Sequence, residues 1–346
     1  MPADAALEPP RALGPRLCAA RLRAEPEDFL VEEQLGFPPS GAGQHVLLKV
    51  RKRNANTQWV ARELARLCGC RPHDVGYAGL KDRRAIAIQW FSVPQSPLTP
   101  VDWLGAQGAG YEVIEAHAHA RKLPRGALAG NRFTIRARGV SASDAQLQER
   151  LAALGARGVP NYFGPQRFGR GGGNLERCAT SLRDLKPPER GFVLSAARSL
   201  VFNAVLAARV EEGAWERLMA GDLAMLDGRG GHFPVEHPDE TLLGRCTRLE
   251  IHPSGPLWGR GAPPSGGAVR ELEERIAAEH PAACALVTAA GMDQERRSLR
   301  LAVRDLSWRR EGPQELVLSF CLVRGAYATV VLGEVFDLGD YEDSST

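Results

Sequence analysis

A single carboxylate stands among basic residues in the part of the sequence best suited to chemistry. Asp82 lies between Lys81 and a pair of arginines, and the apolar segments 75–80 and 85–91 on either side are typical of strands. A turn held between two strands can aim a side chain, and neighbouring positive charges keep a carboxyl group ionised. Such a carboxylate acts as a nucleophile or a base, so we place the chemistry at Asp82. A Lys-Asp-Arg-Arg sequence alone is also typical of a solvated surface turn, so the rest of the chain must decide.

A glycine-rich loop at residues 158–174 is the second candidate site. Aromatic rings alternate in it with guanidinium groups, namely Tyr162, Phe163, Arg167, Phe168 and Arg170. Asn174 is placed to cap a following helix, whose unpaired backbone N–H groups would suit a phosphate. The loop can equally be a hinge whose aromatic residues pack a domain junction. The dinucleotide fingerprint fails at Asn174 and no Gly-Lys-Ser/Thr sequence occurs, so nucleic acid ranks above a free nucleotide.

Length and composition limit the number of domains and the cellular location that we expect. A chain of 346 residues predicts two domains, or one domain that carries a large insertion. Hydrophobic residues at 44% and charged residues at 25% are ordinary values for a globular protein. No apolar run approaches the length of a membrane span, and the N-terminus lacks a basic start followed by an apolar block. We therefore expect a cytoplasmic protein without membrane contact.

Charge and cysteine usage narrow the choice of partners and cofactors. The net charge of +3 is weak evidence for a polyanionic partner, and a GC-rich genome explains most of the excess of arginine over lysine. The seven cysteines are scattered, which fits free thiols in a reducing compartment. No His-Glu-x-x-His sequence occurs, and the carboxylate cluster of a metal-dependent nuclease is lacking. We predict no metal site.

Strand patterns cluster at both ends of the chain and helix patterns in the middle. Candidate strands cover residues 29–33, 45–50, 75–80, 85–91, 131–138, 299–303 and 316–322. Candidate helices cover residues 57–69, 145–153 and 195–212, two segments around Pro281 and a short one from about 329. Thr57 can cap the first helix and Gly69 can end it, and Ser195 is the expected cap of the third. The Gly- and Pro-rich stretch 222–264 is expected to be irregular. This distribution predicts one mixed or antiparallel sheet built from both chain ends and interrupted by an inserted domain.

Several stretches of the sequence together resemble the tRNA pseudouridine synthase D family. The long ones are residues 76–83 (Gly-Tyr-Ala-Gly-Leu-Lys-Asp-Arg), 126–134, 159–169 and 194–203, and the short ones are 25–29 and 325–329. They occur in the order of the family and span nearly the whole chain. Each long stretch is too specific to arise by chance.

The resemblance implies a fold and a reaction. The fold is α+β, with a catalytic domain built on a pseudouridine-synthase-like mixed or antiparallel sheet and an inserted, helix-rich α+β domain. We assign residues 15–157 plus 304–340 to the catalytic domain, 158–303 to an inserted RNA-binding domain, and 1–14 and 341–346 to flexible ends. The implied reaction converts a uridine of tRNA, at position 13 of the D-arm in the family, to pseudouridine without a cofactor or metal.

The same resemblance implies roles for individual residues. Asp82 falls on the catalytic aspartate of the family. Asn131 and Phe133 fall on a motif beside the active site, where a ring would stack on the uracil. From its pattern alone, Phe133 is an inward residue of an alternating strand. Arg23 stands where the family can have a lysine near the aspartate, and Tyr327 stands near the pocket, where the family often has phenylalanine. We assign both residues to substrate binding.

The remaining predictions concern RNA contact and mechanism. Three residues are assigned to RNA contact or to a hinge, namely Tyr162, Arg167 and Arg170. The basic group at residues 51–53 either contacts phosphates or is ordinary surface charge. The target base must leave its stack, after which Asp82 attacks the anomeric carbon or removes a ribose proton. We expect a monomer with tRNA as its partner. A non-catalytic RNA-binding protein is the alternative, and Asp82 with its flanking cations argues against it.

Overall fold

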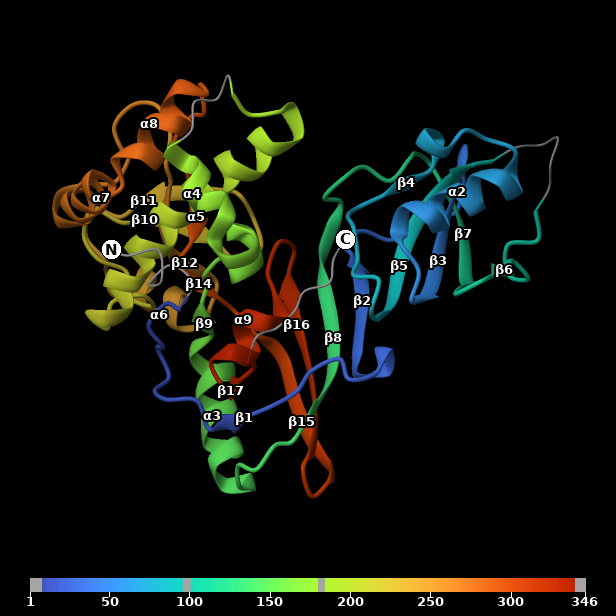
Figure 1. Cartoon of the computed structure of the whole chain (residues 1–346), viewed down its shortest axis with the longest axis horizontal. Helices are drawn as coiled ribbons and strands as arrows, with labels where there is room; N and C mark the ends of the chain where they lie inside the picture. Colours follow the sequence, from blue (N-terminus) through green and yellow to red (C-terminus); the bar gives the residue numbers. More distant parts are fainter. Residues whose placement is uncertain (1–7, 96–100, 180–183, 340–346) are drawn as a thin grey trace. The chain divides into compact units, whose positions relative to one another are not determined.

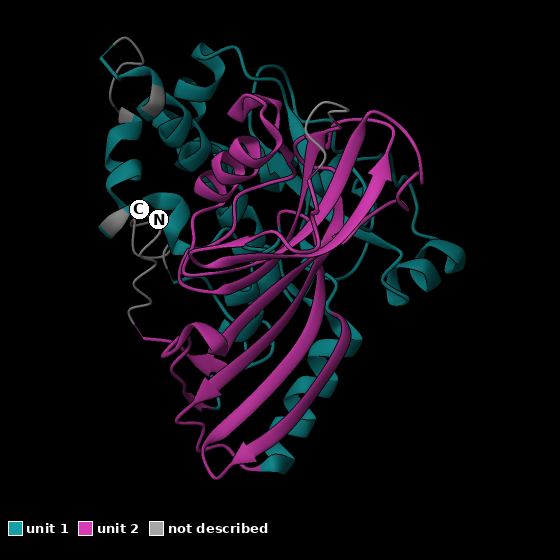
Figure 2. Cartoon of the chain, turned by 90° about the vertical axis from the view of Figure 1, so that its right-hand side faces the viewer, with its two compact units in different colours: residues 1–17, 144–303, 326–335 teal, residues 18–143, 304–325, 336–346 magenta. Residues whose placement is uncertain are grey.

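The computed structural model describes residues 8–95, 101–179 and 184–339, whose helices and strands are shown in Figure 1. The chain divides into two compact units (Figure 2). Unit 1 comprises residues 1–17, 144–303 and 326–335, and unit 2 comprises residues 18–143, 304–325 and 336–346. Each unit is therefore assembled from three separate stretches of chain.

The unit boundaries differ in detail from the expected domain ranges. Residues 158–303 belong to unit 1, but so do 144–157 and 326–335, which we expected in the catalytic domain. Of the expected flexible ends, residues 1–7 and 341–346 lie outside the described residues. The N–H groups of Ala12 and Leu13 both donate to the Glu334 carboxylate at 3.2 Å, so this part of the N-terminal stretch is held within unit 1.

Within the described residues, unit 2 is built around a nine-stranded mixed sheet. Its strands lie in the order β15 (Arg304–Gly312), β16 (Glu315–Val323), β8 (Leu128–Arg138), β2 (Phe29–Leu35), β5 (Ile86–Pro94), β3 (His45–Arg53), β7 (Tyr111–His119) and β6 (Gln107–Gly108), and β4 (Gly76–Tyr77) pairs with β5. Strands β2 and β5 are parallel, and their other neighbours in the sheet are antiparallel. The sheet thus joins strands from both ends of the chain, as predicted.

Helix α2 (Thr57–Cys68) supplies the core on one face of this sheet. The side chain of Asn56 caps its first turn, and Gly69 ends it with a φ of +68°, a conformation that suits glycine. Val60, Leu64 and Cys68 recur at helical spacing and pack against apolar residues of β3, β5 and β7. The expected helix and its C-terminal glycine are confirmed, although Asn56 rather than Thr57 is the cap.

Short elements complete unit 2. They are β1 (Cys18–Ala19), η1 (Pro26–Asp28), η2 (Pro72–Asp74) and β17 (Phe336–Asp337). Strands β1 and β17 pair in parallel. The whole segment 75–80 was expected to be a strand, but only Gly76–Tyr77 pairs, because the residues that follow turn toward β5.

Unit 1 combines helices with short strands. Its elements in the described residues are α3 (Asp144–Arg157), β9 (Val159–Pro160), η3 (Pro165–Phe168), η4 (Arg170–Gly172), α4 (Gly173–Glu176), η5 (Arg177–Ala179), α5 (Pro187–Glu211), β10 (Leu223–Leu226), β11 (His232–Pro234), α6 (Glu240–Thr247), β12 (Ile251–Leu257), α7 (Gly267–Glu279), α8 (Pro281–Ala289), β13 (Glu295–Ser298), β14 (Arg300–Leu301) and α9 (Ala328–Gly333). A sheet in the order β11-β10-β12-β13 forms one layer, and β9 pairs with β14.

The stretch 222–264 is not irregular, and that expectation was wrong. It contains α6 and three strands of the unit 1 sheet. Strand β12 is buried along nearly its whole length, so it shows no alternation of apolar and polar residues. Its proline and glycine residues also resemble a turn composition, which concealed the strand.

Helix α5 forms the centre of unit 1. Its side chains enter three separate apolar clusters, which include Ala197, Phe202 and Val205. A helix that is apolar all round belongs in a core. The helix starts at Pro187, a residue favoured in the first turn, so Ser195 lies inside it and is not its cap as predicted.

One segment of α5 has the length and composition of a membrane span. Residues Glu189–Glu211 have a mean hydropathy of 1.6, and 67% of the most apolar window is buried within the protein. We expected no apolar run of this length, and that expectation was wrong. A buried core helix passes the same test of length and composition, so these two properties alone do not make α5 a membrane span.

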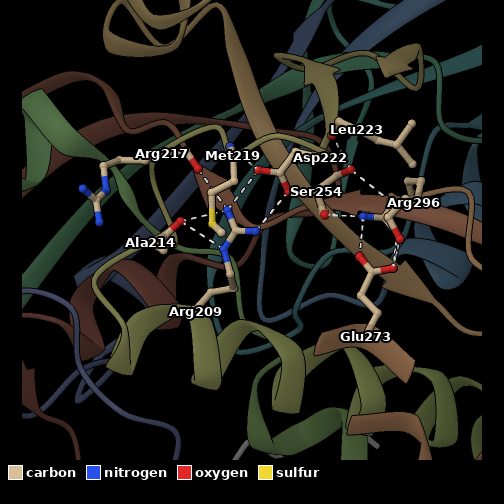
Figure 3. Close-up of polar contacts among 10 residues, drawn as sticks. Arg209, Ala214, Arg217, Met219, Asp222, Leu223, Ser254, Glu273 and Arg296 are labelled. Atoms are coloured by element: carbon tan, nitrogen blue, oxygen red, sulfur yellow. Dashed lines mark hydrogen bonds and ion pairs between the residues drawn. The ribbon is translucent and has the colours of Figure 1, made fainter. Parts of the chain in front are cut away.

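Two buried ion pairs lie inside unit 1 (Figure 3). Arg209 binds Asp222 through both guanidinium nitrogens, at 3.0 and 3.1 Å. Arg296 binds Glu273 in the same two-point manner, at 2.8 and 3.0 Å. All four side chains are at most 1% exposed. Two-point contacts of this kind compensate the loss of hydration of both charges.

Candidate active site

Asp82 lies in the turn between β4 and β5, and its carboxylate is held at two points. Oδ1 accepts a hydrogen bond from the backbone N–H of Arg84 at 3.0 Å, and Oδ2 forms an ion pair with Arg23. The side chain of Asp82 is 16% exposed and that of Arg23 is 17% exposed. The carboxylate is therefore fixed in direction while part of it stays accessible.

A chain of hydrogen bonds ties this turn, which we call the Asp82 turn (residues 78–85), to α2 and β5. The N–H of Lys81 donates to Thr57 Oγ1 at 3.1 Å, and the Thr57 hydroxyl donates to Gln89 Oε1 at 3.0 Å. The Gln89 amide in turn donates to the carbonyl of Gly79 at 2.7 Å. Thr57 and Gln89 are both buried. A buried polar chain whose members are bonded to one another rigidifies the backbone around it.

The neighbouring cations that we expected beside Asp82 contact other groups. Lys81 Nζ lies 2.6 Å from Glu33 Oε1, and Glu33 Oε2 accepts from the backbone N–H of Trp90 at 2.8 Å. Burial raises the pKa of Glu33, while the Lys81 ammonium acts to lower it. Arg83 Nε donates to the Asn54 carbonyl at 3.3 Å. Arg23, which is distant in sequence, pairs with Asp82 instead.

Lys52 is a buried cation beneath the Asp82 turn. It is 1% exposed, and its ammonium donates to the carbonyls of Ala55 and Asp82 at 2.8 Å each and of Lys81 at 3.4 Å. Burial lowers the pKa of Lys52 to about 8, and the negative charge of Asp82 acts to raise it. Strand β3 thereby fixes the backbone of the residue that we expect to do the chemistry.

Arg23 is held by its backbone and by an aromatic ring. Its φ is +55°, a conformation that non-glycine residues adopt only when their surroundings hold them in it. Its guanidinium carbon lies 4.0 Å from the centroid of the Phe29 ring, close enough for a cation–π interaction. These two constraints direct the guanidinium toward Asp82.

Asn131 and Phe133 lie on β8, one side-chain period apart. Their register partners on β2 are Glu33 and Val31, so both side chains share the face that carries Glu33. Asn131 Oδ1 is buried and meets no hydrogen-bond donor among the described residues. Phe133 is 7% exposed and packs against Phe29 and Phe320, with ring centroids 6.0 and 5.6 Å apart. Phe133 therefore has the packing of an inward strand residue.

The other predicted contact residues belong to unit 1. Tyr162 is 3% exposed and packs with Phe202 and Trp215, which gives it a core role in this structure. Burial raises the pKa of its hydroxyl. Arg167 donates to the hydroxyls of Ser195 and Tyr327, both at 2.9 Å. The side chain of Arg170 lies outside the described part of the structure.

The basic group at residues 51–53 does not form a continuous cationic strip. Lys52 points inward, as described above. Arg51 pairs with Glu112 at 3.3 Å, and Arg53 pairs with Glu27 at 2.7 Å. The two exposed arginines already have acidic partners, which favours the interpretation as ordinary surface charge.

Three candidate functional residues were not found from sequence. Two of them, Glu33 and Lys52, lie beside the Asp82 turn in unit 2. The third is a second arginine of unit 1, Arg297, whose side chain lies against Phe163. A charged residue within the apolar alternation of a strand was the available signal for Glu33 and Lys52. Arg297 carried no signal, because it is one of several arginines in a polar stretch.

No metal site is found among the described residues, and a hollow lies near the Asp82 turn. Among them, no group of three His, Cys, Asp or Glu side chains is placed to hold a metal ion. All seven cysteines are free thiols, as expected. A hollow of about 330 Å³ opens beside Arg83, and its lining consists of Asn54, Ala55, Asn56, Trp59, Arg83 and Ala109.

Comparison with known proteins finds one family along almost the entire chain. The model of the tRNA pseudouridine synthase D (TruD) family matches residues 15–178 and 172–335. A tRNA pseudouridine synthase D of Nitrosococcus oceani is 47% identical over 343 residues, which cover 97% of this chain and 96% of the relative. The enzymes of the same name from Methylococcus capsulatus and Pseudomonas aeruginosa are 45% and 46% identical, and each match covers 95% of this chain and 94% of the relative.

A solved structure shares the fold. A crystal structure described as a putative tRNA pseudouridine synthase D from Methanosarcina mazei superposes with a TM-score of 0.71 at 20% sequence identity. The match covers 96% of this chain and 95% of that one. At this identity the likeness concerns the fold, and the expected α+β architecture with a mixed sheet is confirmed.

Proposed function

Because this chain belongs to the tRNA pseudouridine synthase D (TruD) family, we propose that it isomerises uridine 13 in the D-arm of tRNA and that Asp82 is its catalytic carboxylate. Family membership makes the chain an isomerase that converts uridine in tRNA to pseudouridine. The position in tRNA and the role of Asp82 are the parts that we add. The resemblance of residues 76–83 to the family motif motivates both.

The geometry of Asp82 is the observation that carries the proposal. The backbone around Asp82 is fixed by hydrogen bonds from Lys52 and to Thr57. The carboxylate oxygens of Asp82 contact the N–H of Arg84 and the guanidinium of Arg23. The carboxylate therefore has one preferred direction. Preorganisation of this kind is what a reacting group requires. A solvated surface turn, the simpler interpretation, would not need buried partners from α2, β2 and β3.

The proposed reaction needs no co-reactant. Asp82 attacks C1′ of the ribose or removes a ribose proton, and in both routes the C1′–N1 bond breaks. The uracil turns within the site and a C1′–C5 bond forms, as the Asp82–C1′ bond breaks in the first route or as the ribose regains its proton from Asp82 in the second. C5 then loses a proton and N1 gains one. Atoms and electrons balance over this sequence, so the product is an isomer of the substrate.

The target uridine has to leave its stack to reach Asp82, and we propose Asn131 as the residue that recognises it. Enzymes that act on a base read its edge through hydrogen bonds after extruding it. Asn131 Oδ1, a buried acceptor without a donor in the described residues, suits the N3–H of a uracil. Phe133 would support this position through its contacts with Phe29 and Phe320.

Replacement of the carboxylate tests the proposal. We expect Asp82→Asn to lower pseudouridine formation in tRNA by at least about 10⁴-fold, because removal of a reacting group costs that much in other enzymes. Binding of tRNA to this variant should persist. The matched control is Asp102→Asn, an exposed aspartate of the same unit, which should keep full activity.

A transcript that carries cytidine at position 13 tests the choice of base. It should yield no pseudouridine with the wild-type enzyme, whereas the uridine transcript does. Unchanged product with Asp82→Asn would eliminate the proposed role of Asp82. Product at another uridine of the cytidine transcript would eliminate the proposed position and leave the role of Asp82 intact.

A further inference from the structure

We propose that Arg167 and Arg297 together form a binding site in unit 1 for a phosphate of the tRNA backbone. The identification of that phosphate with tRNA rests on the proposed function. The site itself rests on the contacts of the two guanidinium groups, which lie in η3 and β13.

The two guanidinium groups share one aromatic ring. The guanidinium carbon of Arg297 lies 4.2 Å from the centroid of Phe163, and that of Arg167 lies 5.3 Å from the same centroid. Cation–π contacts at these distances hold a guanidinium while leaving its N–H groups available for other partners. The two guanidinium carbons therefore lie at most 9.5 Å from each other, the sum of these two distances.

Among the described residues, the hydrogen-bond partners of this arginine pair are neutral. Arg297 donates to the side-chain oxygen of Asn161 at 2.6 Å, and Arg167 donates to the hydroxyls of Ser195 and Tyr327. In the part of the chain that the structure describes, no carboxylate forms a salt bridge with Arg167 or Arg297. Both side chains are nevertheless half-buried.

Two neighbouring positive charges without a carboxylate partner among the described residues, such as those of Arg167 and Arg297, lower the stability of the folded protein when no ligand is bound. Burial lowers the pKa of Arg297 to about 10, and the nearby charge of Arg167 acts in the same direction. Elsewhere in unit 1, Arg209 and Arg296 each have a carboxylate at hydrogen-bond distance. A bound anion would supply the missing negative charge at the arginine pair.

The donors of the site suit a phosphate. Arginine presents parallel N–H groups that match two oxygens of one phosphate, which is why it recurs in RNA recognition. The Tyr327 hydroxyl accepts from Arg167, so its own proton is left for a second acceptor. Two guanidinium groups and one hydroxyl are sufficient for a monoanionic phosphodiester.

The salt dependence of tRNA binding tests the site. We expect Arg297→Gln and Arg167→Gln to weaken tRNA binding about tenfold each. The slope of log affinity against log salt should fall by about 0.7 to 0.9 for each phosphate that the variant no longer neutralises. Arg260→Gln is the matched control: it removes an exposed arginine of the same unit that is paired with Asp293, and it should leave the slope unchanged.

Thermal unfolding distinguishes a binding role from a structural one. If the arginine pair serves a ligand, Arg297→Gln should melt at an unchanged or higher temperature than the wild type, because it relieves repulsion that no carboxylate of the described residues compensates. Arg297→Lys should restore part of the salt slope, since it restores the charge without the planar fork. An unchanged slope in folded Arg167→Gln would overturn the proposal, even if Arg297→Gln fails to fold.

The test of the phosphate site can be told apart from the test of the catalytic role of Asp82. All binding measurements use the Asp82→Asn background, in which no product forms to complicate them if the proposed function holds. Loss of product in Asp82→Asn with an unchanged salt slope in both arginine variants would overturn the phosphate site alone. A reduced slope together with full activity of Asp82→Asn would overturn the role of Asp82 and keep the phosphate site.

Discussion

Arg209 of unit 1 and Lys52 of unit 2 are both buried cations, but their positive charges are compensated in different ways. In unit 1, Arg209 meets both oxygens of Asp222, and its remaining N–H groups donate to the carbonyls of Ala214 and Arg217 (Figure 3). In unit 2, Lys52 donates to main-chain carbonyls and, within the described residues, touches no carboxylate. The charge of Arg209 is compensated by the carboxylate of Asp222, whereas the charge of Lys52 is not paired with a carboxylate of the described residues and acts on the nearby Asp82.

This difference separates structural charges from functional ones. A buried guanidinium whose three nitrogens all donate to partners within the protein has little capacity to bind a ligand, so its role is structural. A buried cation that is only partly compensated costs stability, and such residues concentrate where a site needs their charge. Lys52 and the arginine pair Arg167 and Arg297 belong to the second kind.

We expect the largest effect on stability from breaking the buried ion pair between Arg209 and Asp222. Asp222→Ala leaves the Arg209 guanidinium buried without its counter-charge, and we expect a loss of about 3 to 5 kcal/mol in the free energy of unfolding. Urea denaturation measures this loss. Asp293→Ala, which removes an exposed partner of Arg260, should leave stability nearly unchanged. Equal losses in the two variants would contradict the distinction.

A smaller effect follows from the pKa of Lys52. The folded protein has a pKa of about 8 for this residue and the ordinary value is 10.5, so the unfolded chain holds more protons between these values. Stability should therefore rise with pH across this window, by at most about 3 kcal/mol from this residue. The difference in unfolding free energy between the wild type and Lys52→Met measures the rise. Parallel pH curves for the two proteins would count against a buried, charged Lys52.

The smallest effect concerns the partly exposed pair of the Asp82 turn. We expect Arg23→Met to lower kcat by about 10- to 100-fold while tRNA affinity stays near that of the wild type, because Arg23 orients Asp82 and does not hold the fold together. Arg23→Lys should recover part of the rate. Arg66→Met removes an exposed arginine of α2 that is paired with Glu63, and it serves as the matched control. A loss of affinity equal to the loss in kcat would instead assign Arg23 to binding.

Local sequence signals predicted the elements that carry their own pattern. The alternation in β8 and β16 and the helical spacing in α2 identified these elements, and the family motif singled out Asp82. The resemblance also pointed to Arg23, which pairs with Asp82 in the structure. Each of these predictions depended on residues close together in sequence or on a motif already known.

Contacts set by the tertiary fold escaped prediction. The parallel pairing of β2 with β5 brings Glu33 to Lys81, and no local pattern specifies which strand becomes a neighbour. The burial of Lys52 depends on the Asp82 turn closing over β3. The strand β12 was missed because burial on both faces removes the alternation by which strands are recognised.

The pairing of β8 with β16 has a consequence for synthesis on the ribosome. Arg138 and Glu315 face each other in this ladder although 177 residues separate them, so β8 emerges long before its partner. During that interval one side of β8 has free N–H and C=O groups, the feature that lets nascent strands join other chains. A polypeptide released before β16 is translated would keep this open edge permanently, and we expect it to aggregate.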